Sequence, residues 1–292
     1  MKPEWLSMKL KMTDEFKEVK STLKELGLVT VCEESHCPNL SECWSGGTAT
    51  FMVLGDTCTR GCRFCNVKTR YYGKPVDEKE PEKLVEAVKK WKLNYIVVTS
   101  VDRDDLEDQG AGHFAKCIEK LKETGILVEV LIPDFRGNVE LIKKIVDAKP
   151  DVIAHNIETV QRLQKKVRDS RANYNQSLFV LETVKKLNPK IFTKSSIIVG
   201  FGETKDEIEQ TMKDLRKINV DFITLGQYLR PSFKHIEVNE YVKPEIFNEY
   251  KEMALKLGFK YAASGPFVRS SYRAGELFMK NILKKEVLND SP

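Results

Sequence analysis

The sequence predicts an α/β protein built on a partial (β/α)6 barrel of the TIM type, with extensions at both ends. Short apolar runs rich in β-branched residues alternate with helical stretches, as expected for parallel strands that are buried on both faces. Polar clusters follow the ends of these runs, where the loops of a barrel gather on one rim. No glycine-rich dinucleotide-binding turn follows the first run, which disfavours an open doubly wound sheet.

The strand candidates are spaced regularly along the chain. They cover residues 48–54, 95–99, 128–132, 152–155, 192–199 and 222–225. The helical stretches between and after them cover about 80–91, 112–124, 138–148, 159–168, 175–188 and 205–218. Six strand–helix units in series predict a parallel sheet, and their regularity favours a sheet that curls into a barrel.

The N-terminal extension is assigned to residues 1–47. It begins with an amphipathic helix over 14–26, for which Thr13 is the expected N-cap and Gly27 the end. The following arm, 28–47, shows no periodicity and predicts a loop that is held together by what it binds.

The barrel is assigned to residues 48–240 and the C-terminal extension to 241–292. The extension contains helical patterns near 245–257 and 274–285. These boundaries place the arm and the last segment outside the repeated strand–helix units.

Composition and charge describe a globular protein. Of 292 residues, 41% are hydrophobic and 31% charged, and the net charge of +5 comes from basic and acidic residues that are interleaved. Nucleic-acid binding would require segregated basic residues, so no nucleic-acid partner is expected. No apolar run reaches the length of a membrane span, and the acidic N-terminus lacks a signal-peptide core, which predicts a cytoplasmic protein without a membrane partner.

Six of the seven cysteines form two triplets with different spacings. Their pattern is C-x4-C-x5-C at Cys32, Cys37 and Cys43, then C-x3-C-x2-C at Cys58, Cys62 and Cys65. In a reducing compartment, closely spaced cysteines are metal ligands more often than disulfides. Three thiolates leave the fourth position of a four-site centre open, and open positions are where metals and clusters do chemistry.

The second triplet favours an iron–sulfur cluster over zinc. Zinc sites usually pair two C-x2-C halves or add a histidine at ligand spacing, and neither follows Cys65. The first triplet by itself fits structural zinc, or buried thiols in a loop, as well as it fits a cluster. Cys117 lies in a helical pattern and is interpreted as a buried residue without a role in chemistry.

The C-x3-C-x2-C motif at the end of the first strand resembles the signature of the radical S-adenosylmethionine (SAM) superfamily. This resemblance implies a [4Fe–4S] cluster whose free iron binds SAM, and a 5′-deoxyadenosyl radical as the reagent. Further stretches resemble the lipoyl synthase family within that superfamily, in the family's order. These stretches are 32–44, 58–65, 99–106, 155–159, 224–229 and 269–274. Arg273 and Phe201 stand where many members have His and Leu, and neither is a cluster ligand.

The family resemblance implies a sulfurtransferase that inserts two sulfur atoms, at C6 and C8, into a protein-bound octanoyl-lysine. Implied partners are an octanoylated lipoyl carrier domain or the glycine-cleavage H protein, and a reduced donor of the ferredoxin or flavodoxin type. Implied cofactors are SAM and two [4Fe–4S] clusters, the auxiliary one on Cys32, Cys37 and Cys43 giving up its sulfide. Its fourth ligand would be Ser270 or Ser271, of which Ser271 is preferred, although ordinary hydroxyls in a loop are the alternative.

Polar residues at the strand ends are candidates for binding SAM, and Arg171 could pair with the SAM carboxylate. The candidates are Thr99, Ser100, Asn156, Glu158, Arg171, Gln227 and Tyr228. Glu158 and the acidic residues 102–105 could instead cap helices, and Arg103 could meet an acidic partner. Two other functions stay open: a methylthiotransferase-type radical SAM enzyme and a zinc-stabilised binding module.

Overall fold

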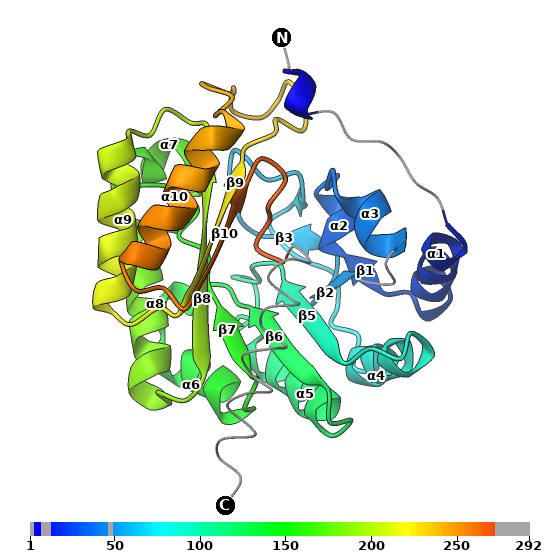
Figure 1. The fold of residues 1–292 in the computed structure, drawn as a ribbon. Coiled ribbons are helices and arrows are strands. Elements are labelled where there is room, and N and C mark those ends of the chain that lie inside the picture. Colours follow the sequence, from blue (N-terminus) through cyan, green and yellow to red (C-terminus); the bar gives the residue numbers. More distant parts are fainter. Residues whose placement is uncertain (1–2, 7–12, 46–48, 272–292) are drawn as a thin grey trace, which may run out of the picture.

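The structure, a computed structural model, describes residues 3–6, 13–45 and 49–271. Its centre is one curved sheet of eight strands in the order β1-β2-β5-β6-β7-β8-β9-β10 (Figure 1). All neighbours pair in parallel except β1 and β2. The described strands leave β1 and β10 as the two edges, so the barrel is partial, as predicted from the sequence.

The strands of this sheet carry mostly buried side chains. They are β1 (Val29–Thr30), β2 (Thr50–Val53), β5 (Tyr95–Ser100), β6 (Leu127–Leu131), β7 (Val152–Ala154), β8 (Phe192–Val199), β9 (Phe222–Gln227) and β10 (Tyr261–Gly265). Six of them lie at the predicted strand positions. The last strand, β10, was missed, and it extends the sheet from within the predicted C-terminal extension.

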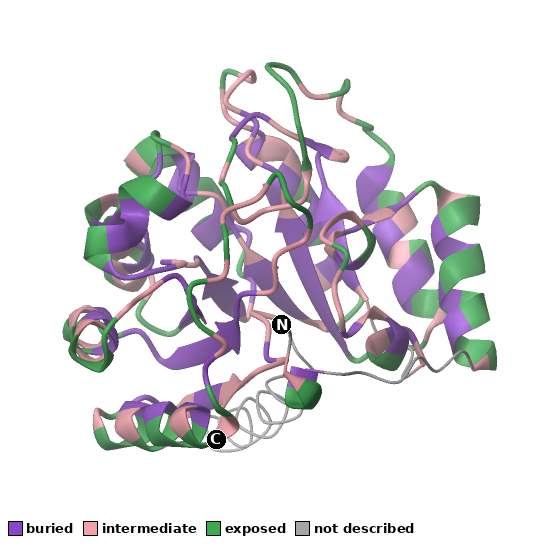
Figure 2. Ribbon diagram, turned by 90° about the horizontal axis from the view of Figure 1, so that it is seen from above, coloured by how far each residue is buried: buried purple, intermediate pink, exposed green. Residues whose placement is uncertain are grey.

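Helices pack on the outer face of the sheet, with their buried sides toward the strands (Figures 1 and 2). They are α4 (Glu80–Lys90), α5 (Ala111–Lys122), α6 (Val139–Asp147), α8 (Tyr174–Leu187), α9 (Lys205–Lys217) and α10 (Pro244–Lys256). The helix predicted over 159–168 is shorter than expected: the 3-10 turn η3 (Gln161–Leu163) leads into one turn of α7 (Gln164–Val167). The helix predicted near 274–285 lies outside the described residues.

The N-terminal helix α1 (Asp14–Leu26) has the predicted caps. Thr13 Oγ1 accepts a hydrogen bond from Phe16 N, and Gly27 ends the helix in the left-handed conformation. The arm after it was wrongly predicted to be a loop. It forms the edge strand β1 and two short helices, α2 (Val31–Glu34) and α3 (Leu40–Ser45), which carry Cys32 and Cys43, and Cys37 lies between the two helices.

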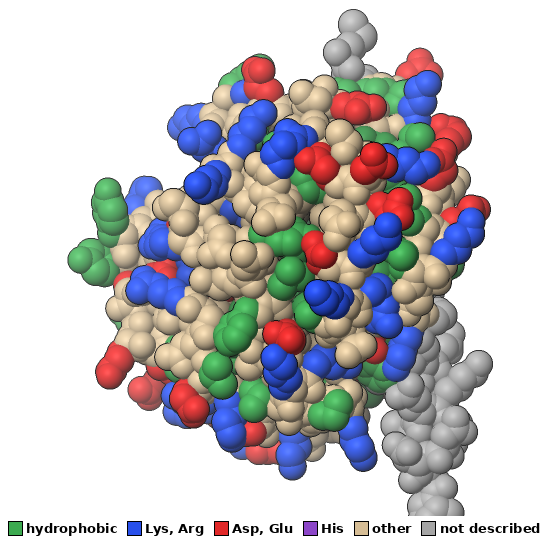
Figure 3. Space-filling view, turned by 90° about the vertical axis from the view of Figure 1, so that its left-hand side faces the viewer, with side chains coloured by type: hydrophobic (Ala, Val, Ile, Leu, Met, Phe, Trp, Pro, Cys, Tyr) green, Lys and Arg blue, Asp and Glu red, His purple; other side chains and the backbone are tan. Residues whose placement is uncertain are grey.

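One face of the molecule carries both signs of charge intermixed. On the face shown in Figure 3, Lys and Arg side chains alternate with Asp and Glu. Within the described ranges, no helix combines the length and apolar character needed to cross a membrane.

Candidate active site

The second cysteine triplet lies on the loop that leaves the first barrel strand. After β2, the short strand β3 (Thr57–Cys58) pairs with β4 (Lys68–Thr69), and the loop between them carries Cys62 and Cys65. The three cysteines line a cavity of about 520 Å³ at the carboxyl ends of the barrel strands. In α/β barrels this end of the strands is where active sites form.

Six of the seven residues predicted to bind SAM line the same cavity. They are Thr99, Ser100, Asn156, Glu158, Gln227 and Tyr228. The buried Oγ of Ser100 and Oδ1 of Asn156 have no hydrogen-bond partner within the described part of the chain. Because buried polar atoms are normally paired, these two fit a polar ligand in the cavity.

Glu158 is held in place by its backbone and by Asn156. Asn156 Nδ2 donates to Glu158 Oε1 at 3.1 Å, and the backbone of Glu158 has a φ of +66°. A left-handed conformation is costly for a residue with a Cβ and is common at functional sites. Burial raises the pKa of Glu158, although Arg168 and Asn156 oppose the shift.

Gln227 and Tyr228 are already engaged with the backbone of the rim. Gln227 Nε2 donates to the carbonyl of Glu240 at 3.0 Å, and Gln227 Oε1 accepts from Val242 N at 2.8 Å. The Tyr228 hydroxyl donates to the carbonyl of Ile236 at 2.8 Å. These two side chains shape the rim, and their polar atoms have less capacity left for a ligand than those of Ser100 and Asn156.

Arg171, the seventh predicted residue, is not among the residues that line the cavity. Its guanidinium donates to Asp169 Oδ1 at 2.8 Å and to the carbonyl of Thr59 at 2.7 Å, and it lies 3.3 Å from Asp104. Four other arginines line the cavity instead: Arg60, Arg168, Arg230 and Arg269. Sequence reasoning assigned none of these arginines to SAM, although Arg60 lies inside the cysteine motif.

The acidic residues after β5 are part of ionic contacts and do not cap α5. Asp104 pairs with Arg60, and Asp105 pairs with Arg103 at 2.8 Å. Arg103 is 2% exposed, so it does not face a partner as suggested. The start of α5 is stabilised by Asp108, whose carboxylate accepts from the backbone N–H groups of Gly110 and Gly112.

The first cysteine triplet lines a second, smaller cavity of about 40 Å³ together with Ser271. Ser271 Oγ accepts a hydrogen bond from Thr50 Oγ1 at 2.9 Å. Ser270 lines the larger cavity instead. The arrangement therefore brings three thiols and the preferred serine hydroxyl to one place.

Close packing at Gly226 lets the C-terminal segment reach this cavity. A Cβ built on Gly226 would lie 2.0 Å from the carbonyl oxygen of Val268. Asn39 Nδ2 also donates to the carbonyl of Phe267 at 2.6 Å, tying the segment to the arm. Cys37 and Arg269 line both cavities, so the two cysteine sites are neighbours.

The thiols are held in a low-dielectric environment. Burial raises the pKa of Cys58 and of Cys62 to about 12, and that of Cys65 and of Cys32 to about 11. Such thiols stay protonated until a metal centre supplies positive charge, and binding then releases their protons. Partly buried thiols in two triplets suit iron–sulfur clusters better than they suit free nucleophiles.

The fold and the site of Cys58, Cys62 and Cys65 define a radical SAM protein. The profile of the Radical SAM superfamily matches residues 52–215. Such a protein uses SAM and a [4Fe–4S] cluster. A lipoyl synthase of Anaeromyxobacter sp. (strain Fw109-5) is 57% identical over 283 residues, which are 97% of this chain and 96% of that protein. The chain belongs to the lipoyl synthase family.

Other relatives are longer than this chain. The apicoplast lipoyl synthase of Plasmodium yoelii yoelii is 56% identical over 286 residues, and the chain spans 57% of its length. Among solved structures, HydG, a maturase of the [FeFe]-hydrogenase, matches with a TM-score of 0.59 over 86% of this chain and 63% of that chain. At 14% identity this last similarity shows the fold alone.

Proposed function

We propose that the protein is a sulfurtransferase that inserts two sulfur atoms, at C6 and C8, into a protein-bound octanoyl-lysine to give lipoyl-lysine. The observation that carries the proposal is the second cavity, in which Cys32, Cys37, Cys43 and Ser271 meet beside the larger one. A superfamily member that only cleaves SAM needs one cluster site, and here a second donor set adjoins the first.

Each group of residues has a defined task in this proposal. Cys58, Cys62 and Cys65 hold the SAM-binding [4Fe–4S] cluster, and the first triplet with Ser271 holds an auxiliary cluster. When bound, SAM and its cluster supply a carbon radical that can remove hydrogen from an unactivated C–H bond, and the auxiliary cluster supplies sulfide.

The protein positions the reactants and excludes water. Ser100 Oγ and Asn156 Oδ1 offer unused hydrogen-bonding capacity to the polar parts of SAM. Apolar side chains of the larger cavity, such as Leu131, Ile132 and Ile198, suit an eight-carbon chain. Because the two cavities share Cys37, an octanoyl chain in the larger cavity can present its carbons to the smaller cavity without leaving the protein.

The proposed partners follow from the reaction. The substrate is carried by a lipoyl domain or the glycine-cleavage H protein, and a ferredoxin or flavodoxin-type protein supplies electrons. The cytoplasmic location stays a prediction, because the relatives include apicoplast and mitochondrial proteins as well as a bacterial one. Their names and their identity to this chain favour this function over a methylthiotransferase or a zinc-stabilised module.

The proposal is tested by anaerobic reconstitution and by turnover of an octanoyl-lysine peptide. Wild-type protein should bind iron and sulfide equal to two four-iron clusters, and replacing the first triplet with alanine should remove half of each. That variant should still cleave SAM, because Cys58, Cys62 and Cys65 are intact, but it should not add sulfur to the peptide. Full sulfur insertion by this variant would overturn the proposal.

A further inference from the structure

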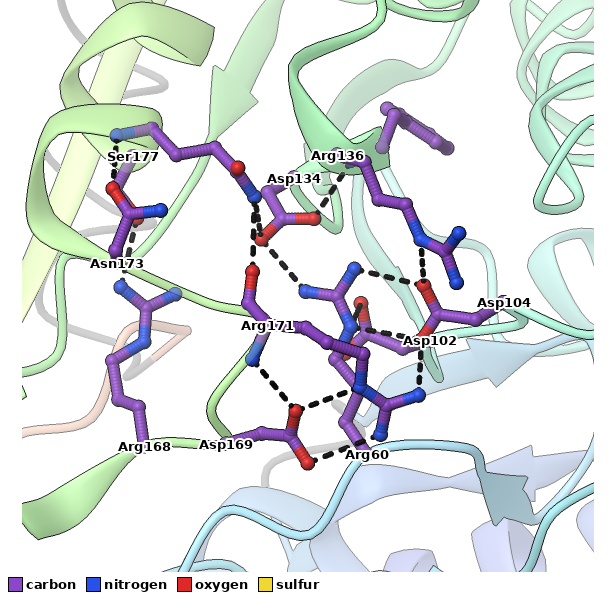
Figure 4. Close-up of polar contacts among 12 residues, drawn as sticks. Arg60, Asp102, Asp104, Asp134, Arg136, Arg168, Asp169, Arg171, Asn173 and Ser177 are labelled. Atoms are coloured by element: carbon purple, nitrogen blue, oxygen red, sulfur yellow. Dashed lines mark hydrogen bonds and ion pairs between the residues drawn. The ribbon is translucent and has the colours of Figure 1, made fainter. Parts of the chain in front are cut away.

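Three carboxylates surround Arg60, the first of the two arginines inside the C-x3-C-x2-C motif (Figure 4). We call Arg60 and its carboxylate partners Asp102, Asp104 and Asp134 the Arg60 clamp. Arg60 Nε and Nη2 donate to the two oxygens of Asp104 at 2.9 and 3.0 Å, and Nη1 donates to Asp134 Oδ2 at 2.7 Å. Arg60 Nε also lies 3.3 Å from Asp102 Oδ1.

The clamp joins parts of the chain that are far apart in sequence. Arg60 lies between Cys58 and Cys62, while Asp102 and Asp104 follow β5 and Asp134 follows β6. The side chain of Arg60 is 3% exposed, and those of Asp104 and Asp134 are 4% and 1% exposed. Buried, two-pronged arginine–carboxylate contacts fix geometry more strictly than single contacts do.

Further hydrogen bonds hold the loop on both sides of Arg60. Thr59 N donates to the carbonyl of Asp102 at 2.9 Å, and Gly61 N donates to Asp169 Oδ2 at 2.8 Å. Arg171 links these sides, because its guanidinium contacts Asp169, Asp104 and the carbonyl of Thr59 (Figure 4). The backbone on both sides of Arg60 is therefore held by contacts with other parts of the protein.

Two backbone N–H groups of this region donate hydrogen bonds to cysteine sulfur atoms. Arg60 N donates to Cys58 Sγ at 3.4 Å, and Asp169 N donates to Cys62 Sγ at 3.3 Å. Hydrogen bonds to ligand sulfurs stabilise iron–sulfur clusters and tune their potentials.

We infer that Arg60 is a positioning residue that holds the Cys58–Cys65 loop in its cluster-binding conformation before a cluster enters. The inference rests on the proposed function only for the identity of the group that these cysteines bind. In the protein, the carboxylate partners hold the Arg60 side chain, the Arg60 backbone N–H donates to Cys58 Sγ, and Arg60 makes no bond to iron. The auxiliary site does not depend on it.

The test compares Arg60→Lys, Arg60→Gln and Arg136→Gln in the full chain. Lysine keeps the charge but cannot form the two-pronged contact with Asp104. Glutamine removes the cation that contacts all three carboxylates, so that variant can fail to fold, and Arg60→Lys then decides. Arg136 is the matched control. Its Nε donates to the same carboxylate, Asp104 Oδ1, at 2.8 Å, but its side chain is 54% exposed to solvent.

Two cluster readouts are measured: the rate at which a chelator removes each cluster, and the SAM-induced change in the electron paramagnetic resonance of the reduced cluster. The melting temperature of the cluster-free protein is measured beside them. Losing the support of a ligand's neighbours typically costs about 10–100-fold in metal affinity. We expect Arg60→Lys to speed loss of the SAM-responsive cluster by about tenfold or more. In Arg60→Lys, the rate of loss of the auxiliary cluster and the melting temperature of the cluster-free protein should stay near their wild-type values. In Arg136→Gln, all of these quantities should stay near their wild-type values.

Two results would overturn the inference. One is wild-type cluster retention and an unchanged SAM response in Arg60→Lys. The other is equal loss of both clusters, which would indicate a general effect on folding. A failed octanoyl-peptide assay with wild-type protein would count against the proposed function and leave this inference standing, because neither readout involves the peptide.

Discussion

Replacing Gly226 with alanine tests how Ser271 reaches the first cysteine triplet. Gly226 lies in β9, between Ile198 of β8 and Gly265 of β10. The new Cβ would lie 2.0 Å from the oxygen and 3.0 Å from the carbon of the Val268 carbonyl. Since Cβ contacts below 3.0 Å are essentially absent from proteins, that carbonyl must retreat by about 1 Å.

The carbonyl cannot move alone. Val268 N donates to the carbonyl of Gly265 at 3.0 Å, and the Val268 carbonyl accepts from Arg269 Nη1 at 2.7 Å. Overpacking of this kind costs roughly 1–3 kcal/mol. For a chain of this size that lowers the melting temperature by roughly 2–12 °C. The same shift carries Ser271 away from Cys32, Cys37 and Cys43, so the auxiliary cluster should be retained poorly.

The assay is thermal melting of cluster-free protein, followed by iron analysis after anaerobic reconstitution. Gly226→Ala should melt earlier and bind about half of the wild-type iron, because only the Cys58 triplet is unaffected. Gly61→Ala is the control: its Cβ would meet nothing closer than Asp169 Oδ2 at 3.9 Å, although Gly61 lies inside the cysteine motif. Wild-type melting and full iron content in Gly226→Ala would refute the reasoning.

Three more predictions follow from the sites. Ser271→Ala should lose the auxiliary cluster faster than Ser270→Ala, measured by chelator challenge, and equal rates would contradict the placement of Ser271 in the second cavity. Burial, with help from Arg168, lowers the pKa of His155 to about 4, below the 6.5 of a free imidazole. Its contribution to stability is therefore complete above pH 6.5 and is lost as the pH falls toward 4. Wild-type protein should lose up to about 3 kcal/mol of its free energy of unfolding in urea across this pH range, and His155→Gln should lose less. The same loss in both proteins would exclude His155 as the cause of the pH dependence. Ser100→Ala and Asn156→Ala should each raise the KM for SAM about fivefold to tenfold, and unchanged steady-state kinetics would remove them from the SAM site.

The sequence predicts the repeated part of the fold well because each strand there is a compact apolar run. The strand β10 reads Tyr-Ala-Ala-Ser-Gly and lacks β-branched residues, so its strand character comes from pairing with β9 and not from local preference. The helices of the arm could not be predicted from the sequence either, because α2 and α3 are too short to show a helical period.

The two cysteine triplets are recognisable from their spacing, but the groups that support them are not. Arg60 contacts carboxylates that lie 44 and 74 residues away, a pairing that depends on which strand ends meet. Arg171 was assigned to SAM because it is basic and near the rim, yet Asp169, two residues earlier, engages its guanidinium. Local ion pairs of this kind decide which arginine remains available to a ligand.

The most direct measurement of the central claim is a single turnover with isotopically labelled sulfide. The protein is reconstituted with heavy-isotope sulfide, washed, and given SAM, a reductant and an octanoyl-lysine peptide. Mass spectrometry should find two heavy sulfur atoms in the peptide, with the label lost when Cys32, Cys37 and Cys43 are replaced with alanine. SAM cleavage with no sulfur in the peptide, or unlabelled sulfur there, would contradict the account.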